Sequence, residues 1–275
     1  MIAFPPTLMP RGPGMLLTGT QMVPDALVGH LTWGAAYLGG AQMSNQIESL
    51  RNAGAHDIFL WAEPMAWEAG NFAASVAQAE RLCRAHGLPG YIADPETAMT
   101  PAQAASCGAM LKGSVLRGFS VGIVSFPGYA RLHDFADGCD GTVWSLCEIH
   151  NRSSDDAHTF RSWYDTVRRL FGRAGICIAT YTPPTPMGET LGTPEGYDAY
   201  LSKLPTSGCW GSFGVGPSFM YRRLATWRQA SMLNLALWAI GLPTIAHMPL
   251  VYSLILCALV AIALLLAFAI RRRFA

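Results

Sequence analysis

Eight short apolar segments recur along residues 15–230 of this 275-residue chain, and helical segments separate most of them. The apolar segments predict strands at 15–20, 33–38, 58–62, 91–93, 121–126, 142–147, 176–181 and 209–213. Helical patterns lie at 44–53, 72–85, 101–111, 130–136, 157–171 and 194–204, and a last one begins at residue 218. The strand segments lack strict alternation of apolar and polar residues, which is typical of parallel strands covered on both faces.

Units of this kind predict an α/β fold, the (β/α)8 or TIM barrel, over residues 15–230. An open, doubly wound parallel sheet is the alternative, but no G-x-G-x-x-G turn follows the first strand. The connection between the first two strands is the irregular part of the pattern, because residues 21–32 contain Pro24 and Gly29. Residues 1–14 hold four prolines and predict an irregular lead-in.

Composition and missing motifs argue against several classes of function. A formal net charge of +1 indicates neither nucleic-acid binding nor attraction of acidic substrates. The seven cysteines are scattered without a C-x-x-C pair, which indicates reduced, mostly buried thiols rather than disulfides or a zinc site. The chain contains no H-E-x-x-H motif, which would predict a metal site, and no G-x-S-x-G motif, which would predict a serine hydrolase. No cofactor is expected. The amino terminus lacks the basic and apolar regions of a secretory signal.

Two carboxylates follow directly after the predicted strand 91–93, at Asp94 and Glu96. In an extended backbone this i, i+2 spacing puts both side chains on one face. Pro95 lacks the N–H that a strand ladder needs, so the ladder should stop there and leave the acids at the carboxyl end of the strand. Barrel enzymes carry their active sites at that end, and a pair of carboxyl groups is the equipment of glycoside hydrolysis. The plain alternative is a solvated loop.

Other strand ends add candidates around the same mouth of the barrel. Glu63 follows the third predicted strand, and Glu148 follows the sixth, with His150 close behind. Aromatic side chains that could stack on a sugar ring are Trp61, Trp67, Tyr129, Trp144, Tyr181 and Trp210. Each candidate also has a plainer interpretation: the tryptophans as core, Glu63 as a helix cap, and His150 as part of an exposed polar loop.

Three segments resemble glycoside-hydrolase-like TIM barrels encoded by bacteriophages and bacteria: residues 88–96, 122–127 and 141–144. They read L-P-G-Y-I-A-D-P-E, G-I-V-S-F-P and G-T-V-W. In those proteins a D-x-E ends strand 4, a Ser-aromatic-Pro run follows strand 5, and strand 6 has an aromatic residue at its end. Family 25 lysozymes and family 18 chitinases share the strand-4 acids.

The resemblance implies a role for each acid. Glu96 would be the general acid, and Asp94 would stabilise the charge that develops on the sugar or orient a substrate acetamido group. Glu148 would supply the second carboxylate, at about 5 Å for a retaining mechanism or about 6.5–9.5 Å for an inverting one. Apolar surroundings that include Trp61 and Trp144, together with the charge of Asp94, should raise the pKa of Glu96.

Two positions depart from the family patterns. Family 25 lysozymes place an Asp on strand 1, where this chain has Thr18 and Thr20. Family 18 has a further Asp at the position of Ile92. A catalytically silent barrel is therefore kept as a second interpretation.

The carboxyl-terminal segment predicts a transmembrane helix. It begins at Leu250, ends at Ile270 and contains no charged residue, and at 1.5 Å per residue it can cross a hydrocarbon core of ~30 Å. A basic tail, 271–275, follows it. Residues 231–249 predict an apolar linker, an interfacial helix or the first arm of a hairpin, since Gly241 and Pro243 interrupt them. The expected partner is the lipid bilayer of a virus or of the bacterial inner membrane, and the side on which the barrel lies stays open.

These features predict a membrane-anchored glycoside hydrolase that cleaves peptidoglycan when a phage enters or lyses its host. Its expected partners are the bilayer, a peptidoglycan glycan and, in a virion, membrane or capsid proteins. The alternative is a silent TIM barrel that acts as a structural or glycan-binding protein of a membrane or virion. A mouth that holds both acids in an open groove would favour the enzyme, and a mouth closed by loops would favour the silent barrel.

Overall fold

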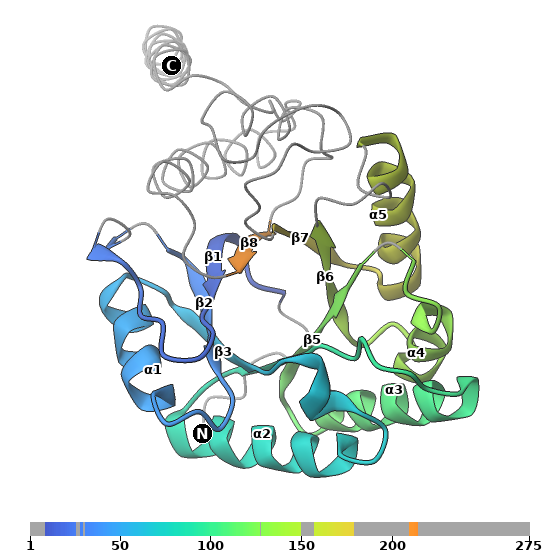
Figure 1. The fold of residues 1–275 in the computed structure, drawn as a ribbon, viewed down its shortest axis with the longest axis horizontal. Coiled ribbons are helices and arrows are strands. Elements are labelled where there is room, and N and C mark those ends of the chain that lie inside the picture. Colours follow the sequence, from blue (N-terminus) through green and yellow to red (C-terminus); the bar gives the residue numbers. More distant parts are fainter. Residues whose placement is uncertain are drawn as a thin grey trace, which may run out of the picture. The chain divides into compact units, whose positions relative to one another are not determined.

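The computed structural model describes residues 9–25, 28–29, 31–126, 128–149, 157–178 and 209–213. All of these residues belong to one compact unit, Met1–Ala225. Eight parallel strands, each hydrogen-bonded to the next, close into a barrel in the order β1 to β8 (Figure 1). The prediction of a parallel, TIM-barrel-like α/β fold is confirmed, and the open sheet is excluded.

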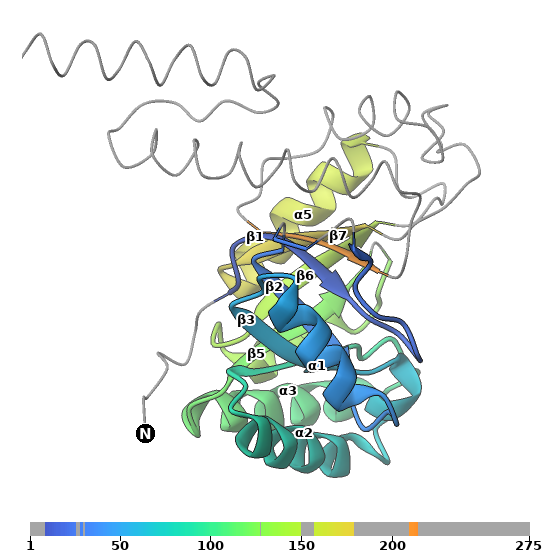
Figure 2. The same ribbon diagram turned by 90° about the vertical axis from the view of Figure 1, so that its left-hand side faces the viewer.

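The strands are short, as the sequence predicts. They are β1 Gly12–Leu16, β2 Trp33–Tyr37, β3 Asp57–Trp61, β4 Gly90–Ala93, β5 Ser120–Ser125, β6 Trp144–Ile149, β7 Ala174–Ile178 and β8 Cys209–Phe213. The described helices are α1 Met43–Asn52, the 3-10 turn η2 Pro64–Trp67, α2 Phe72–His86, α3 Pro101–Leu116, α4 Leu132–Cys139 and α5 Ala157–Phe171. These helices lie outside the ring of strands (Figure 1, Figure 2). Between β1 and β2 the described residues form no α-helix, in line with the irregular sequence there.

Strand β1 corrects the predicted lead-in. It begins at Gly12 and ends at Leu16, because it pairs along its whole length with β8. Thr18 and Thr20 therefore lie beyond the strand, whereas the sequence predicts both within it. Thr18 leaves the ladder because its N–H and its hydroxyl both donate to Oε1 of Gln21, at 3.1 and 2.8 Å.

The first residues of strands β6 and β7 also differ from the prediction. The N–H of Thr142 donates to Cys139 O (3.1 Å) in the turn that ends α4, so β6 starts only at Trp144. The pairing of β7 with β6 begins with Ala174 opposite Ser145, two residues before the predicted start of β7. The predicted helix 194–204, the helix from 218, the linker 231–249 and the segment 250–270 lie outside the described residues.

Aromatic residues fill the barrel interior, and glycines on neighbouring strands make room for them. Trp33 and Trp144 both contact Phe59 edge to face, with ring centroids 6.5 and 5.5 Å apart. A Cβ on Gly14 would lie 2.0 Å from the Trp33 ring, and one on Gly122 would lie 2.5 Å from the Trp144 ring. The interior cluster consists of Leu16, Trp33, Ala35, Phe59, Trp61, Ile92, Val124, Trp144, Leu146, Cys177 and Cys209.

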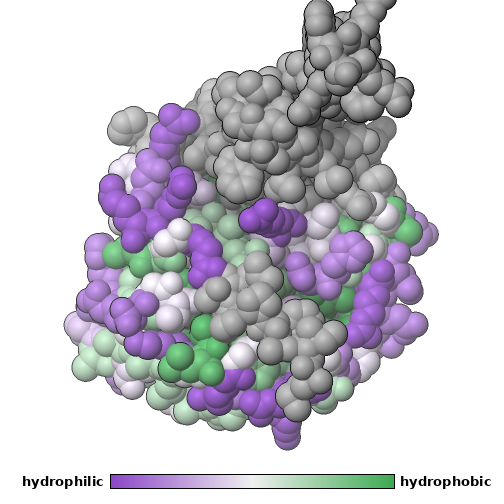
Figure 3. Space-filling view, turned by 180° about the vertical axis from the view of Figure 1, so that it is seen from behind, coloured by the Kyte–Doolittle hydropathy of each residue, from purple (hydrophilic) through white to green (hydrophobic). Residues whose placement is uncertain are grey.

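Few large apolar side chains of the described part of the chain are exposed. In the view of Figure 3, hydrophilic residues are spread over the coloured surface, with hydrophobic residues in smaller areas between them. The exposed large apolar side chains within the described ranges are Val28, Met65, Met110 and Leu116. Six cysteines lie in the described part, and all six are buried thiols, as predicted.

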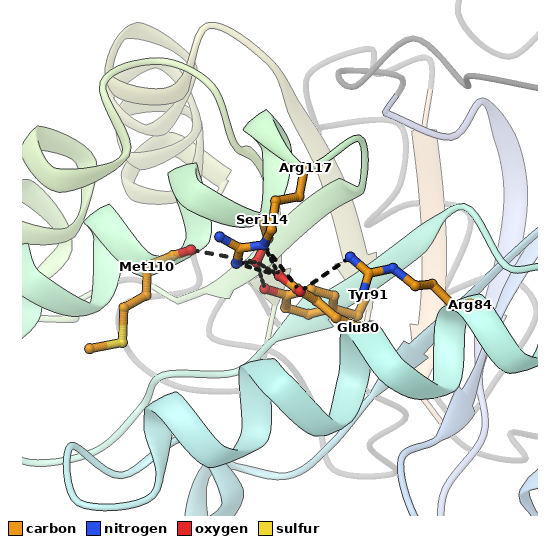
Figure 4. Close-up of polar contacts among 6 residues, drawn as sticks. All are labelled: Glu80, Arg84, Tyr91, Met110, Ser114 and Arg117. Carbon is orange, nitrogen blue, oxygen red and sulfur yellow. Dashed lines mark hydrogen bonds and ion pairs between the residues drawn. The ribbon is translucent and has the colours of Figure 1, made fainter.

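A buried carboxylate ties the outer face of β4 to two helices (Figure 4). Glu80 of α2 accepts hydrogen bonds from Ser114 Oγ (2.6 Å) and from Nε of Arg117 (3.0 Å). Ser114 lies in α3, and Arg117 follows directly after its last residue. The hydroxyls of Tyr91 and Ser114 lie 2.7 Å apart. Burial, the largest influence, acts to raise the pKa of Glu80, but hydrogen bonds from Arg117 and Ser114 and the charges of Arg117 and Arg84 outweigh it and lower that pKa.

We expect Glu80→Gln to lower the free energy of unfolding at pH 7 by about 1–3 kcal/mol, because a neutral amide cannot replace these charge-assisted hydrogen bonds. A carboxylate whose pKa is lowered by folding stabilises the protein above its unfolded-state pKa, and that stabilisation is lost as the pH falls through the folded-state value. The difference between parent and variant should therefore shrink in acid. Denaturant titrations between pH 7 and pH 3 measure it, with the exposed Glu48→Gln of α1 as control. Equal stability at pH 7 would contradict this prediction.

Candidate active site

The acidic segment begins where β4 ends. The last paired residue of β4 is Ala93, so the ladder stops before Pro95, as the sequence predicts. Ile92 belongs to the barrel interior, and because side chains alternate along a strand, Asp94 lies on the same inner face. Asp94 is only 5% exposed, whereas Glu96 is partly exposed.

Three other carboxylates act on Asp94. Burial is the largest cause that raises the pKa of Asp94 well above its ordinary value, and the charges of Glu96, Glu148 and Glu63 raise it further. Its Oδ1 atom is buried and has no hydrogen-bond partner among the described residues. A carboxyl group in such surroundings keeps its proton at pH values at which an exposed carboxyl group is ionised. We call Glu63, Asp94, Glu96 and Glu148 the acid cluster.

Two members of the acid cluster come from β6 and from the end of β3. Glu148 is 6% exposed and shares the inner face of β6 with Trp144 and Leu146. Glu63 is exposed and accepts a hydrogen bond from the Tyr37 hydroxyl; burial first, then the charge of Glu63 and this bond, raise the pKa of Tyr37. Glu63 precedes η2, but its side chain makes no capping hydrogen bond there. The side chain of Glu63 therefore binds Tyr37 and does not cap η2.

Two of the aromatic residues predicted to bind sugar lie in the barrel interior. Trp61 is 3% exposed, and its Nε1 donates to Leu17 O (2.8 Å). Trp144 is fully buried, and its Nε1 donates to Ser120 Oγ (3.1 Å). Neither indole has an open face on which a sugar ring could stack, so both have the core role of the plainer interpretation. Trp67 is also fully buried, stacked on Tyr91, and is core as well.

Three other predicted residues cannot be placed at the site. His150 and Tyr181 lie outside the described residues, and so does the side chain of Trp210, whose backbone pairs with Pro13 and Ile176. Their contacts with a sugar stay predictions. Within the described ranges, no group of three or more His, Cys, Asp or Glu side chains could hold a metal ion. The ionisable groups that the described site brings together are the carboxyl groups of the acid cluster.

Two tyrosines make contacts with the acidic segments that the sequence does not assign. Tyr37 donates to Glu63; the sequence places Tyr37 at the end of the second predicted strand, at the mouth, but assigns it no contact. Tyr129 is 8% exposed, and its Oη donates to the backbone oxygen of Pro95 (2.6 Å). The sequence predicts Tyr129 at the mouth as a sugar-binding ring. It does not predict the hydrogen bond to Pro95, because a contact between two loops leaves no pattern in either loop.

The chain matches no family model and no curated protein. Solved structures do match it. An endo-β-N-acetylglucosaminidase from Cordyceps militaris has a TM-score of 0.56 at 12% identity, over 80% of this chain and 91% of that chain. A fungal endo-β-N-acetylglucosaminidase of glycosyl hydrolase family 18 has a TM-score of 0.50 at 12% identity, over 80% of this chain and 97% of that chain. This chain shares their fold.

A second structure of the Cordyceps enzyme has a TM-score of 0.56 at 11% identity, over 80% of this chain and 91% of that chain. In that variant an Asp and the Glu two positions later are replaced by Asn and Gln, and it is in complex with fucosyl-N-acetylglucosamine-Asn. The resemblance to glycoside-hydrolase barrels seen in the sequence is thus confirmed at the level of the fold.

Proposed function

We propose that the protein is a glycoside hydrolase in which Glu96 donates a proton to the oxygen of the scissile glycosidic bond. The observation that carries this proposal is the acid cluster on the inner face of the barrel, with Asp94 and Glu96 just beyond the carboxyl end of β4. Barrel enzymes have their active sites at that end of the strands. The Asp and Glu replaced in the Cordyceps variant have the same spacing as Asp94 and Glu96, which supports the proposal.

The raised pKa of Asp94 separates the two roles that the resemblance implies for it. A carboxyl group that keeps its proton carries no charge with which to stabilise a positive sugar, but its O–H can donate a hydrogen bond. We therefore assign Asp94 to orienting the acetamido group of an N-acetyl sugar beside Glu96. Glu148, also buried at the mouth, is the second carboxylate of the proposed site.

Peptidoglycan is the substrate that we propose within this class. Its glycan strands contain N-acetylglucosamine, the sugar named in the enzymes that share the fold. A hydrolase anchored in a membrane would stay close to the cell wall, which suits a protein that acts when a phage enters or lyses its host.

The deciding experiment incubates the full chain in detergent with purified peptidoglycan and, in parallel, with chitin oligosaccharides. Mass spectrometry of the soluble products identifies any new reducing end. Products from peptidoglycan support the full proposal, and products from chitin alone keep the hydrolase but change its substrate. Binding to both glycans without any product would favour the silent barrel.

The membrane anchor is tested separately. Within the described ranges, no helix is long and apolar enough to cross a membrane, and the segment from Leu250 to Ile270 lies outside those ranges. We expect the full chain to resist carbonate extraction from membranes, because an uncharged segment of this length fits the hydrocarbon core. A chain that ends at Gln229 should move to the supernatant. Persistent pelleting of the shortened chain would contradict a single anchor at 250–270.

A further inference from the structure

Tyr129 lies in the loop between β5 and α4, and its ring is packed against two others. The ring centroids of Phe126 and Phe135 lie 5.7 and 6.2 Å from that of Tyr129. The N–H of Tyr129 donates to Phe126 O (3.2 Å), and the intervening Gly128 has a φ of 89°, a left-handed conformation that favours glycine. The turn and the packing together give the Tyr129 ring one well-defined place.

The hydroxyl of Tyr129 reaches the backbone between the two acids of β4. Its Oη donates to Pro95 O (2.6 Å), and the same oxygen accepts the N–H of Thr97 (2.7 Å). The proline ring already fixes φ at this position. With its carbonyl oxygen bound from two sides, the peptide between Pro95 and Glu96 has little freedom to rotate. A rotation of that peptide would move the carboxyl groups of Asp94 and Glu96 relative to each other.

We propose that Tyr129 is a positioning residue whose hydrogen bond to Pro95 holds Asp94 and Glu96 in the geometry that glycosidic cleavage requires. This inference rests on the proposed hydrolase function and adds a residue that touches neither the substrate nor the reacting atoms. A displacement of about 1 Å in an active site can cost about 100-fold in rate, so a bond that fixes one peptide plane has a measurable effect.

The protonation of Tyr129 suits this role. Burial is the largest cause that raises the pKa of its hydroxyl, and Cys107 and the charges of Glu96 and Asp94 raise it further. The hydroxyl therefore stays protonated, and remains a donor to Pro95 O, over the whole range in which the carboxyl groups titrate.

The test compares two variants, each of which removes one buried tyrosine hydroxyl that donates to a backbone carbonyl oxygen. Tyr129→Phe removes the donor to Pro95, and Tyr164→Phe removes the donor to Ala174 O (3.0 Å) at the amino-terminal end of β7, away from the carboxyl ends where the acids lie. Tyr164 is 4% exposed, so the two hydroxyls are similarly buried. Both variants should lose a similar amount of stability, a fall in Tm of about 2–4 °C. Only Tyr129→Phe should lower kcat on the glycan that the parent cleaves, by about 10-fold or more, with KM within about twofold.

Equal kcat values for the two variants would overturn the inference, because Tyr129 would then have only a structural role. A raised KM with unchanged kcat would also overturn it, since that pattern indicates lost substrate binding. A parent that cleaves neither peptidoglycan nor chitin refutes the proposed function instead. Positioning is then measured by the ¹³C titration of the Asp94 carboxyl group, which should change in Tyr129→Phe and not in Tyr164→Phe; an unchanged titration in both would refute it.

Discussion

Replacing Glu96 with Gln should lower kcat by about 100-fold or more, the usual contribution of general acid catalysis. The amide keeps the shape of the side chain but has no proton to give to the leaving oxygen. Glu96 is partly exposed at the mouth and its charge acts on the buried Asp94, so the change should leave the fold intact and should not lower Tm. Initial rates on the glycan that the parent cleaves, together with thermal unfolding, measure both effects.

The matched control for this prediction is Glu68→Gln. Glu68 is exposed at the end of η2 and undergoes the same loss of charge without belonging to the acid cluster. It should retain the parental rate. A Glu96→Gln protein that cleaves glycan as fast as the Glu68→Gln protein would rule out Glu96 as the proton donor.

The sequence predicts the barrel well because each parallel strand is buried on both faces and therefore reads as a short apolar run. The predicted range 209–213 coincides with β8 Cys209–Phe213, and 33–38 exceeds β2 Trp33–Tyr37 by one residue. Strand ends are harder to predict, because pairing with neighbouring strands sets them. β1 extends back to Gly12 since β8 offers partners along its whole length.

The acids of the site are predictable for a similar reason, whereas the groups that hold them are not. The i, i+2 spacing of Asp94 and Glu96 and the stop at Pro95 are properties of one strand and are read directly from it. The bond from Tyr129 to Pro95 joins two loops, and the bond from Tyr37 to Glu63 joins two strand ends. No local pattern encodes such contacts. Trp144 illustrates a second difficulty. Tryptophan occurs both as a ring that stacks on sugars and as a core residue, and only the structure shows that Trp144 is buried in the core.

The substitution Asp94→Asn should stabilise the protein at neutral pH, because the neutral amide folds without the proton that the buried Asp94 must take up. Asp94 in the unfolded chain titrates near its ordinary pKa of 3.8, and in the folded protein its pKa is raised by burial and by the charges of Glu96, Glu148 and Glu63. Between these two values the folded state binds a proton that the unfolded state has released. Stability therefore falls as the pH rises through this window. An amide is uncharged at every pH and takes up no proton on folding, so the pH-dependent cost of folding disappears in the variant.

The gain in stability should come with a loss of activity, because the burial of Asp94 beside the other acids costs stability and serves the proposed site. We expect kcat to fall by about 10-fold or more in Asp94→Asn, because the substitution removes the carboxyl O–H that orients the acetamido group beside Glu96. Asp57→Asn is the control, since burial also raises the pKa of Asp57, but that residue starts β3 at the opposite end from the acids. Asp57→Asn should keep the parental rate. Denaturant titrations from pH 4 to pH 7 test the stability, and the excess of Asp94→Asn over the parent should grow with pH. A variant that is less stable than the parent at pH 7, or an excess that is constant over this range, would mean that Asp94 is not the strained, protonated acid on which the proposed chemistry depends.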